Sequence, residues 1–284
     1  MSELFRALVL RNAGDRGYRA GFEDLTVEDL PEGDVLVDVE YSDLNYKDGL
    51  AVTGRGRIVR DLPLVPGVDL AGRVVTSKSD LYRPGDAIVS TGWHVGEKYW
   101  GGYAQKARLR SEWLVPLPEG LDARQAMAVG TAGFTAMQCV LALEDGAARP
   151  DGGPVVVTGA AGGVGSVAVA ILAGLGYEVH AVTGRAETHA YLRDLGASAL
   201  LTRDQMTAAP RALESARWAG AVDAVGGVML ARVLAECREG ATVAACGLAG
   251  GHDLPTTVMP FILRGVRLQG INSVTVSLAQ RRKI

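Results

Sequence analysis

Three glycines stand where backbone atoms, rather than side chains, could bind a ligand. Gly159, Gly162 and Gly165 follow the β-branched run 155–158 and open the apolar segment 165–175. Glycine there lets the chain turn tightly and approach a pyrophosphate, and the N-terminus of the following helix offers free N–H groups to the anion. Such a triplet alone is weak evidence, but its place between a predicted strand and a predicted helix indicates a dinucleotide-binding loop. The loop residues expected to contact this ligand are Gly159, Gly162, Gly163, Val164 and Gly165.

The end of the next predicted strand, residues 178–183, bears on which nicotinamide dinucleotide is bound. NAD sites usually place Asp or Glu there to bind the ribose 2′-hydroxyl. This chain has Thr183, Gly184 and Arg185 instead. An acid would repel a 2′-phosphate, whereas Arg185 can pair with it through two hydrogen bonds and Thr183 can donate another. The pattern predicts NADPH as the cofactor, with a solvated loop arginine as the alternative.

Two other glycine-containing stretches follow predicted strands, at 223–226 and 246–250. Ligands of doubly wound sheets bind at the carboxyl ends of the strands. Cys246 is either a reactive thiol there or a packed core residue. Two threonine hydroxyls in a predicted helix either reach the cofactor or bond to the preceding turn. The candidates from these stretches are Thr131, Thr135, Gly226, Cys246, Gly247 and Leu248.

The pattern of apolar residues divides the chain into domains. The first 120 residues contain short apolar runs separated by Pro and Gly, which predicts strands at 7–10, 34–39, 72–75 and 87–90 and a partly open barrel. From residue 122 onward, strands alternate with helices, which predicts a doubly wound parallel sheet and an α/β fold class. We expect domains at 1–121 and 122–272, followed by the start of a truncated helix at 273–284.

Composition excludes several classes of protein. The 284 residues carry a net charge of −3, so we expect neither a nucleic-acid partner nor an anionic membrane surface. The sequence has no run of about 18 uninterrupted apolar residues, so no membrane span is expected. Three widely spaced cysteines predict no disulfides and a cytoplasmic location. Since no Cys precedes Cys139 and only His94 precedes it among the histidines, zinc ligands cannot be assembled in the first domain, and we expect no metal.

Several motifs together resemble a known family over essentially the whole chain. They include Tyr41-Ser-Asp-Leu-Asn-Tyr-Lys-Asp48, Leu64-Val-Pro-Gly-Val-Asp69, Trp100-Gly-Gly-Tyr-Ala104, Thr91-Gly-Trp-His-Val-Gly-Glu97, Gly130-Thr-Ala-Gly-Phe-Thr-Ala136 and Pro255-Thr-Thr-Val-Met-Pro-Phe-Ile-Leu-Arg264. These resemble the zinc-free, quinone-oxidoreductase-like medium-chain dehydrogenases/reductases, in their acryloyl-CoA reductase branch. The resemblance implies a GroES-like catalytic domain, a Rossmann domain, NADPH, no metal and reduction of acryloyl-CoA to propanoyl-CoA. Family members extend further at the C-terminus, and many form homodimers.

In the resembled family, the turn at residues 45–48 faces the nicotinamide. Hydride transfer to an enoyl thioester leaves an enolate, which needs a hydrogen-bond donor near its oxygen and a proton at the α-carbon. Tyr46 is the candidate for either task, with Lys47 or Asp48 adjusting its environment and Asn45 on the same turn. The alternative is that Tyr46 packs against the cofactor and water supplies the proton.

Arg55, Arg57 and Arg60 crowd the loop that follows this turn. The loop either meets the phosphates of a CoA thioester, to which arginine is well matched, or is simply solvated. Three functions stay open: acryloyl-CoA reduction, reduction of a quinone or an alkenal by NADPH, and non-catalytic NADPH binding by a sensor or a crystallin-like protein.

Overall fold

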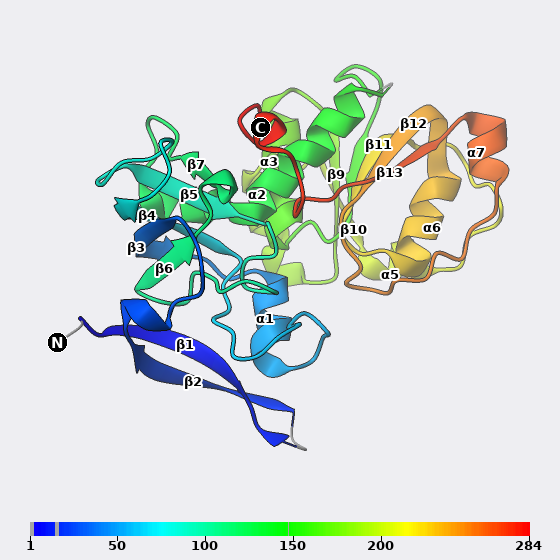
Figure 1. The fold of residues 1–284 in the computed structure, drawn as a ribbon. Coiled ribbons are helices and arrows are strands. Elements are labelled where there is room, and N and C mark those ends of the chain that lie inside the picture. Colours follow the sequence, from blue (N-terminus) through cyan, green and yellow to red (C-terminus); the bar gives the residue numbers. More distant parts are fainter. Residues whose placement is uncertain (1–2, 15–16, 147) are drawn as a thin grey trace. The chain divides into compact units, whose positions relative to one another are not determined.

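The computed structural model describes residues 3–14, 17–146 and 148–284. It divides into two compact units (Figure 1). The N-terminal unit contains the described residues up to Thr131 together with Ser273–Ile284, and the central unit is Ala132–Asn272.

The N-terminal unit is built on an antiparallel sheet with the strand order β6-β3-β4-β5-β7. Its strands are β3 (Val35–Ser42), β4 (Asp69–Ser77), β5 (Ala87–Thr91), β6 (Lys106–Leu109) and β7 (Leu114–Pro116). A second antiparallel pair joins β1 (Phe5–Asn12) to β2 (Tyr18–Leu25). Alternate side chains of β3 and β4 point into one apolar core, as the two-residue period of strands requires. The four strands predicted from sequence in this unit overlap β1, β3, β4 and β5.

Short helices and turns complete the N-terminal unit. They are η2 (Val27–Asp29), α1 (Tyr46–Thr53), η3 (Ser111–Trp113) and α8 (Leu278–Arg281). The turn at residues 45–48 thus opens helix α1. The C-terminal segment is fastened by Arg281, which is 8% exposed and donates hydrogen bonds to Thr91 Oγ1 at 2.8 Å and to the Ser273 carbonyl at 2.7 Å. Burial lowers the pKa of Arg281 to about 10, so its guanidinium remains charged at neutral pH.

The central unit contains a six-stranded parallel sheet with the order β10-β9-β8-β11-β12-β13. Its strands are β8 (Val155–Val157), β9 (Val179–Thr183), β10 (Ala199–Thr202), β11 (Trp218–Asp223), β12 (Cys237–Ala245) and β13 (Arg267–Gly270). The helical segments are α3 (Gly163–Gly174), η4 (Ala186–Thr188), α4 (His189–Asp194), α5 (Arg203–Thr207), α6 (Gly227–Glu236) and α7 (Met259–Arg264). Val155 and Val157 pack into one core and Val156 into another. Because β8 is buried on both faces, its sequence is a continuous apolar run.

The long helix α2 (Ala123–Glu144) is two helices joined at Gly130, whose φ of 49° and ψ of −160° are not helical. Asp122 caps the first helix by accepting a hydrogen bond from the Gln125 amide at 2.7 Å. Ala126 and Met127 pack against Ala71 of β4. The first half of α2 therefore belongs to the N-terminal unit, and the units divide after Thr131 instead of at the expected residue 121.

Helix α2 is long and apolar, although the sequence contains no uninterrupted apolar run of about 18 residues. Among the described residues, it is the one helix whose length and composition would suit a membrane span, and half of its apolar window is buried inside the molecule. The break at Gly130 divides the helix, and the buried side chains belong to two protein cores. These features are those of a core helix.

Candidate functional site

The glycine loop has the backbone geometry that a bound pyrophosphate needs. Gly159 adopts a φ of +60°, and Gly162 caps α3. A β-carbon on Gly165 would lie 2.4 Å from the Gly159 carbonyl oxygen, so no larger residue fits without moving the backbone. The loop therefore stays close to the first turn of α3, where amides of Gly163 and Val164 lie ahead of any intrahelical acceptor.

A buried carboxylate contacts the residue that precedes this loop. Asp223 at the end of β11 is fully buried, and its two oxygens accept hydrogen bonds from Thr158 Oγ1 at 2.7 Å and from the Gly226 amide at 2.8 Å. Its carbonyl accepts from the Cys246 amide at 2.8 Å. Burial raises the pKa of Asp223, while these hydrogen bonds oppose the shift. One residue thus joins the carboxyl ends of β8, β11 and β12, although sequence reasoning gave it no role.

The loops after β11 and β12 lie directly against each other. Gly226 adopts a φ of +70° and forms a bridge with Gly251. A β-carbon on Gly247 would lie 2.3 Å from the Ala224 carbonyl oxygen. Leu248 is 62% exposed at the tip of its loop. The predicted cofactor residues of these two loops therefore lie on one edge of the parallel sheet.

Cys246 is half-buried, and its thiol donates to the Asp223 carbonyl at 3.4 Å. It packs against the same apolar core as Cys139. A hydrogen bond from Cys139 lowers the pKa of Cys246, with burial opposing it. All three cysteines are free thiols in this structure.

The residues expected to select the dinucleotide lie together after β9. Thr183 is 6% exposed, and its hydroxyl accepts a hydrogen bond from the Arg185 amide at 3.2 Å. The Arg185 guanidinium donates to the carbonyl of Ala161, in the glycine loop, at 3.0 Å. A second cation stands beside them, because a β-carbon on Gly184 would lie 3.7 Å from Arg203 Nε. Sequence reasoning missed Arg203, which begins the helix after a different strand.

In the N-terminal unit, Asn45 caps α1 and Asp48 closes the turn. Asp48 is fully buried, and its oxygens accept hydrogen bonds from the Asn45 amide at 2.9 Å and the Val68 amide at 3.0 Å. Burial raises its pKa, and these backbone donors oppose the rise. With both oxygens occupied, Asp48 positions the turn and is not presented to a ligand. Tyr46, next to it, is 71% exposed.

The side-chain amide of Asn45 contacts two further acids. Its Nδ2 donates to Asp43 Oδ1 at 2.6 Å and to Asp69 Oδ2 at 2.9 Å. Asp69 is fully buried and also accepts hydrogen bonds from the amide and the hydroxyl of Thr131, at 2.7 and 2.6 Å. The Thr131 hydroxyl is therefore directed at Asp69. Gly130 allows this approach, since a β-carbon there would collide with Asp43 Oδ2.

The carboxylates of Asp43 and Asp69 share one poorly solvated site. Burial, then the charge of Asp69 and a hydrogen bond with it, raise the pKa of Asp43 to about 8. The pair therefore retains a proton to higher pH than an isolated aspartate does. Two like charges so close cannot both ionise at ordinary cost. Neither acid was assigned a role from the sequence.

The remaining predicted residues divide by exposure. Arg55, Arg57 and Arg60 are exposed and form no ion pair within the described part of the chain. Thr135 is 4% exposed in the second half of α2. The arginines are thus accessible to a solute, whereas the Thr135 hydroxyl is largely enclosed.

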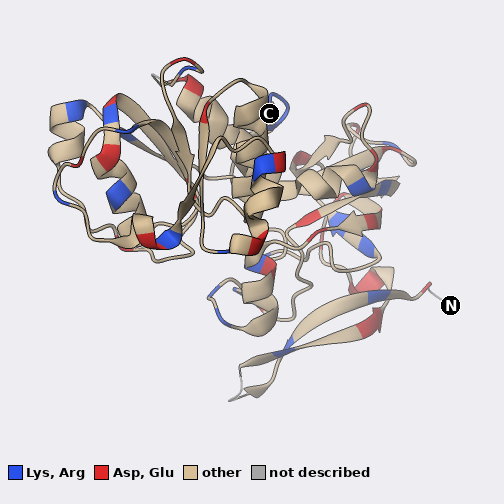
Figure 2. Cartoon of the chain, turned by 180° about the vertical axis from the view of Figure 1, so that it is seen from behind, with Lys and Arg blue, Asp and Glu red and all other residues tan. Residues whose placement is uncertain are grey.

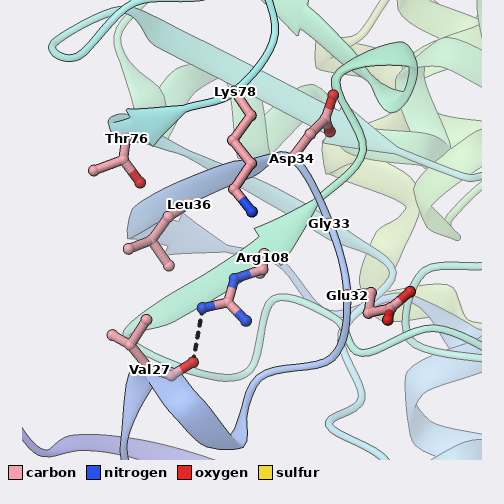
Figure 3. Close-up of a pocket in the computed structure, with 8 residues that line it drawn as sticks. All are labelled: Val27, Glu32, Gly33, Asp34, Leu36, Thr76, Lys78 and Arg108. Carbon is pink, nitrogen blue, oxygen red and sulfur yellow. Dashed lines mark hydrogen bonds between the residues drawn. The ribbon is translucent and has the colours of Figure 1, made fainter.

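A cavity in the N-terminal unit contains none of these residues. Its volume is about 550 Å³, and Lys78 and Arg108 line it (Figure 3). Arg108 donates hydrogen bonds to the Leu30 and Val27 carbonyls, both at 2.9 Å. The cavity is therefore separate from the turn at residues 45–48. No group of three or more His, Cys, Asp or Glu residues among those described could hold a metal ion.

An antiparallel β domain followed by a parallel sheet with a glycine loop is the architecture of a medium-chain dehydrogenase/reductase. Residues 31–119 match the alcohol dehydrogenase GroES-like domain, and residues 163–281 match the zinc-binding dehydrogenase family model. An acrylyl-CoA reductase of Ruegeria pomeroyi is 60% identical over 98% of this chain and 85% of its own length. The chain belongs to the zinc-free medium-chain dehydrogenases/reductases, in the group that includes the acrylyl-CoA reductases.

Other relatives agree with this assignment. A putative quinone oxidoreductase of Bacillus subtilis is 46% identical over 96% of this chain and 83% of its own. The crystal structure of an oxidoreductase from Salmonella enterica in complex with NADP superposes with a TM-score of 0.95. That protein is 55% identical, over 98% of this chain and 85% of its own. The fold class and the family predicted from sequence are confirmed.

The Asp43 carboxyl predicts a pH dependence of stability. Its pKa is about 8 in the folded protein, above the usual value near 3.9 of an unfolded chain, so the folded state binds the proton more tightly. Stability should fall as pH rises between these values, by at most about 1.4 kcal/mol per pH unit, and level off above pH 8. Asp43→Asn should flatten this decline in the thermal unfolding midpoint between pH 5 and 9. The exposed Asp80→Asn is the control, and an unchanged slope in Asp43→Asn would contradict the assignment.

The contacts of Asp223 predict that a substitution at this buried residue weakens cofactor binding. Asp223→Asn removes the charge that orders the loops after β8 and β11. We expect NADPH, the cofactor that the sequence predicts, to bind roughly tenfold more weakly, since a hydrogen bond to a charged group contributes about 1.5–3 kcal/mol. Titration by cofactor fluorescence measures this. Asp253→Asn, whose side chain is 93% exposed in the same unit, is the matched control. A folded Asp223→Asn protein with wild-type affinity would refute the role.

Proposed function

We propose that this chain reduces the carbon–carbon double bond of acryloyl-CoA with NADPH, giving propanoyl-CoA. The observation that carries the proposal is the 60% identity to an acrylyl-CoA reductase over 98% of the chain. A relative that is 55% identical binds NADP in its crystal structure. Reduction of an enoyl thioester needs a nucleotide site and a hydrogen-bond donor beside the substrate, and the two units contain candidates for both.

The central unit fits the dinucleotide. The close approach of Gly165 to Gly159 leaves the loop backbone open to a pyrophosphate, and the first-turn amides of α3 are suited to bind its oxygens. When bound, NADPH supplies the hydride that adds to the β-carbon of the thioester. The residues proposed to hold it are Gly159, Gly162, Gly163, Val164, Gly165, Thr183, Gly184, Arg185, Gly226, Cys246, Gly247 and Leu248, with Thr131 and Thr135, which follow the break in α2.

Recognition of the ribose 2′-phosphate is proposed for the cations after β9. Arg185 lies against the glycine loop through Ala161, and Arg203 lies beside Gly184. The segment Thr183–Arg185 contains no acid that would repel a phosphate. Two guanidinium groups with matching fork geometry favour a dianion over the 2′-hydroxyl of NADH.

In the N-terminal unit, Tyr46 is the proposed donor. Its side chain is largely exposed on the first turn of α1, where a phenol can donate to the enolate oxygen or protonate the α-carbon. Asn45 is fixed by Asp43 and Asp69, and Asp48 anchors the turn. Their task is to hold the turn in one geometry, which is how a preorganised site stabilises developing charge. Protonation by water with Tyr46 as a packing residue is the alternative.

The proposed substrate class, a CoA thioester, is supported by the exposed arginines as well as by the relatives. Arg55, Arg57 and Arg60 are proposed to meet the phosphates of CoA, because exposed cations without carboxylate partners attract phosphate. Reduction of a quinone by the same fold is the second candidate, favoured by the Bacillus subtilis relative at 46% identity. A purely sensory role has no such support, since the relatives reported above carry the names of oxidoreductases.

The protein is proposed to act in the cytoplasm, without a metal, as a homodimer. Strand β13 ends the parallel sheet and all four of its residues are exposed, so its backbone can pair with a second copy. Ile262 and Leu263 of α7 are also exposed. Basic and acidic residues are interspersed along the described elements (Figure 2), which supports neither a nucleic-acid nor a membrane partner.

Arg185→Ala should separate the two nicotinamide cofactors. A lost charge-assisted contact of about 1.5–3 kcal/mol corresponds to roughly tenfold to more than a hundredfold in affinity. We expect this loss for NADPH and little change for NADH in equilibrium titrations, with Arg203→Ala behaving in the same direction. An equal loss for both cofactors would exclude a 2′-phosphate contact.

A substrate panel tests the function itself. Oxidation of NADPH should be fastest with acryloyl-CoA and slow with free acrylate and with quinones, because the CoA moiety supplies binding energy that the smaller substrates lack. Tyr46→Phe should then lower kcat more than it weakens NADPH binding. Preferred turnover of a quinone would replace the proposed substrate, and an unchanged kcat in Tyr46→Phe would leave that residue with packing alone.

A further inference from the structure

A chain of charged side chains starts at the turn that carries Tyr46. Lys47 Nζ lies 2.7 Å from Glu97 Oε1, and the other oxygen of Glu97 lies 3.1 Å from His94 Nδ1. Glu97 is only 9% exposed, whereas the Lys47 and His94 side chains remain 39% and 33% exposed. One buried carboxylate therefore holds two more exposed nitrogen groups at the surface.

The backbone of Glu97 is fastened to the arginine loop. Its carbonyl accepts a hydrogen bond from the amide of Arg60 at 3.1 Å. Glu97 thus contacts, through different atoms, both the turn after β3 and the last residue of the loop that contains Arg55 and Arg57. The side chain of Glu97 contacts one segment and its backbone contacts the other.

The turn that supplies Glu97 is conformationally unusual. Trp93 and His94 have φ angles of 56° and 60°, values that residues with a β-carbon rarely adopt. The His94 carbonyl accepts hydrogen bonds from the amides of Glu97, Lys98 and Tyr99 at 3.2, 2.9 and 3.1 Å. Such backbone conformations persist only where surrounding contacts enforce them, and they concentrate at functional sites.

Glu97 is ionised and more deeply buried than the charged residues around it. Burial opposes ionisation of Glu97, but hydrogen bonds and charges from Lys47 and His94 prevail and lower its pKa. Glu97 is thus a permanent anion that is itself nearly enclosed. The neighbouring cations Lys47 and Arg60 are more exposed, and Asp61, the acid that follows Arg60 in sequence, is exposed as well. Lys47 and Arg60 are therefore accessible to an anionic solute.

We propose that Glu97 is a positioning residue that orients Lys47 and the end of the arginine loop into one binding surface for the phosphates of a CoA thioester. The inference rests on the proposed function and extends it, because it assigns Lys47 to substrate recognition and makes Glu97 its support. A lysine with one proton held by a buried carboxylate keeps its other donors directed outward. Holding the side chain in advance reduces the conformational entropy lost on binding.

The experiment measures binding separately from turnover. Glu97→Gln keeps the size of the side chain and removes its charge, and Lys47→Met removes the cation. Isothermal titration with CoA alone should show a roughly threefold to tenfold weaker affinity for each variant, the size expected when one charged contact is loosened. KM for acryloyl-CoA should rise more than kcat falls. The double variant should lose little more than Lys47→Met alone, since both act through one contact.

Two controls isolate the role. Glu23→Gln breaks a comparable part-buried pair, in which Arg11 Nη2 lies 2.7 Å from Glu23 Oε2 on the β1–β2 pair, and it should leave CoA affinity unchanged. A short acryloyl thioester without phosphates should show nearly the same KM in all variants. Lys47→Met, at a more exposed position, decides the question if Glu97→Gln fails to fold.

The outcomes separate this inference from the proposed function. Unchanged CoA affinity in both variants, or equal losses for the short thioester, would overturn the role of Glu97 while leaving acryloyl-CoA reduction intact. If the wild-type protein binds CoA but does not reduce acryloyl-CoA, the proposed reaction fails. In that case, weaker CoA binding in Glu97→Gln and Lys47→Met would still support the inferred surface.

Discussion

The hydrogen bonds of the buried Asp223 carboxylate determine how the central unit presents a nucleotide. A parallel sheet brings the carboxyl ends of its strands to one edge, but each strand leads into a loop with many accessible conformations. Asp223 accepts hydrogen bonds from Thr158 and Gly226, and its carbonyl accepts one from Cys246. The glycines beside these contacts are required because the tethered backbones pass too close for side chains. The cost of burying a charge is offset only when its hydrogen bonds are satisfied, so this carboxylate fixes the loops strongly.

In the N-terminal unit, two buried carboxylates likewise accept hydrogen bonds that fix the backbone. Asp48 accepts backbone amides from residues 45 and 68, and Asp69 accepts the amide and hydroxyl of Thr131. Both acids organise the backbone around the turn that presents Tyr46. The sequence suggested that Asp48 adjusts the environment of Tyr46, and both oxygens of Asp48 accept backbone hydrogen bonds inside the protein.

Local sequence patterns predicted the elements in which the residue types themselves indicate burial or close backbone approach. The run 155–157 is apolar because β8 is covered on both faces, and Gly159 to Gly165 marks the loop by steric need alone. Strand β13 escaped prediction because all four of its residues are exposed, so it has no apolar period. The edge strand β2 is likewise mostly exposed. Their pairing depends on neighbours in space, which a single strand's sequence does not record.

The site residues divide in the same way. Arg185 was predicted from its place after a strand, whereas Thr158, Asp69 and Glu97 were missed because their partners are 65, 62 and 50 residues away. Thr158 had been absorbed into an apolar strand, and Asp69 into a family motif with no role attached. Long-range polar contacts leave no periodic signal, so only the fold brings such residues together.

The distribution of charge explains why an acidic chain can still bind anionic ligands. Net charge at pH 7 is −3, yet the described part of the chain buries five carboxylic acids and one arginine. Most of these acids accept hydrogen bonds from their own backbone or hold a neighbouring cation in place. They are removed from the surface that a solute meets, while Arg185, Arg203 and the arginine loop remain accessible. Screening in water limits each charge to about 8 Å at physiological salt, so a phosphate responds to the local cations. The total charge of the chain does not determine the charge of its ligand.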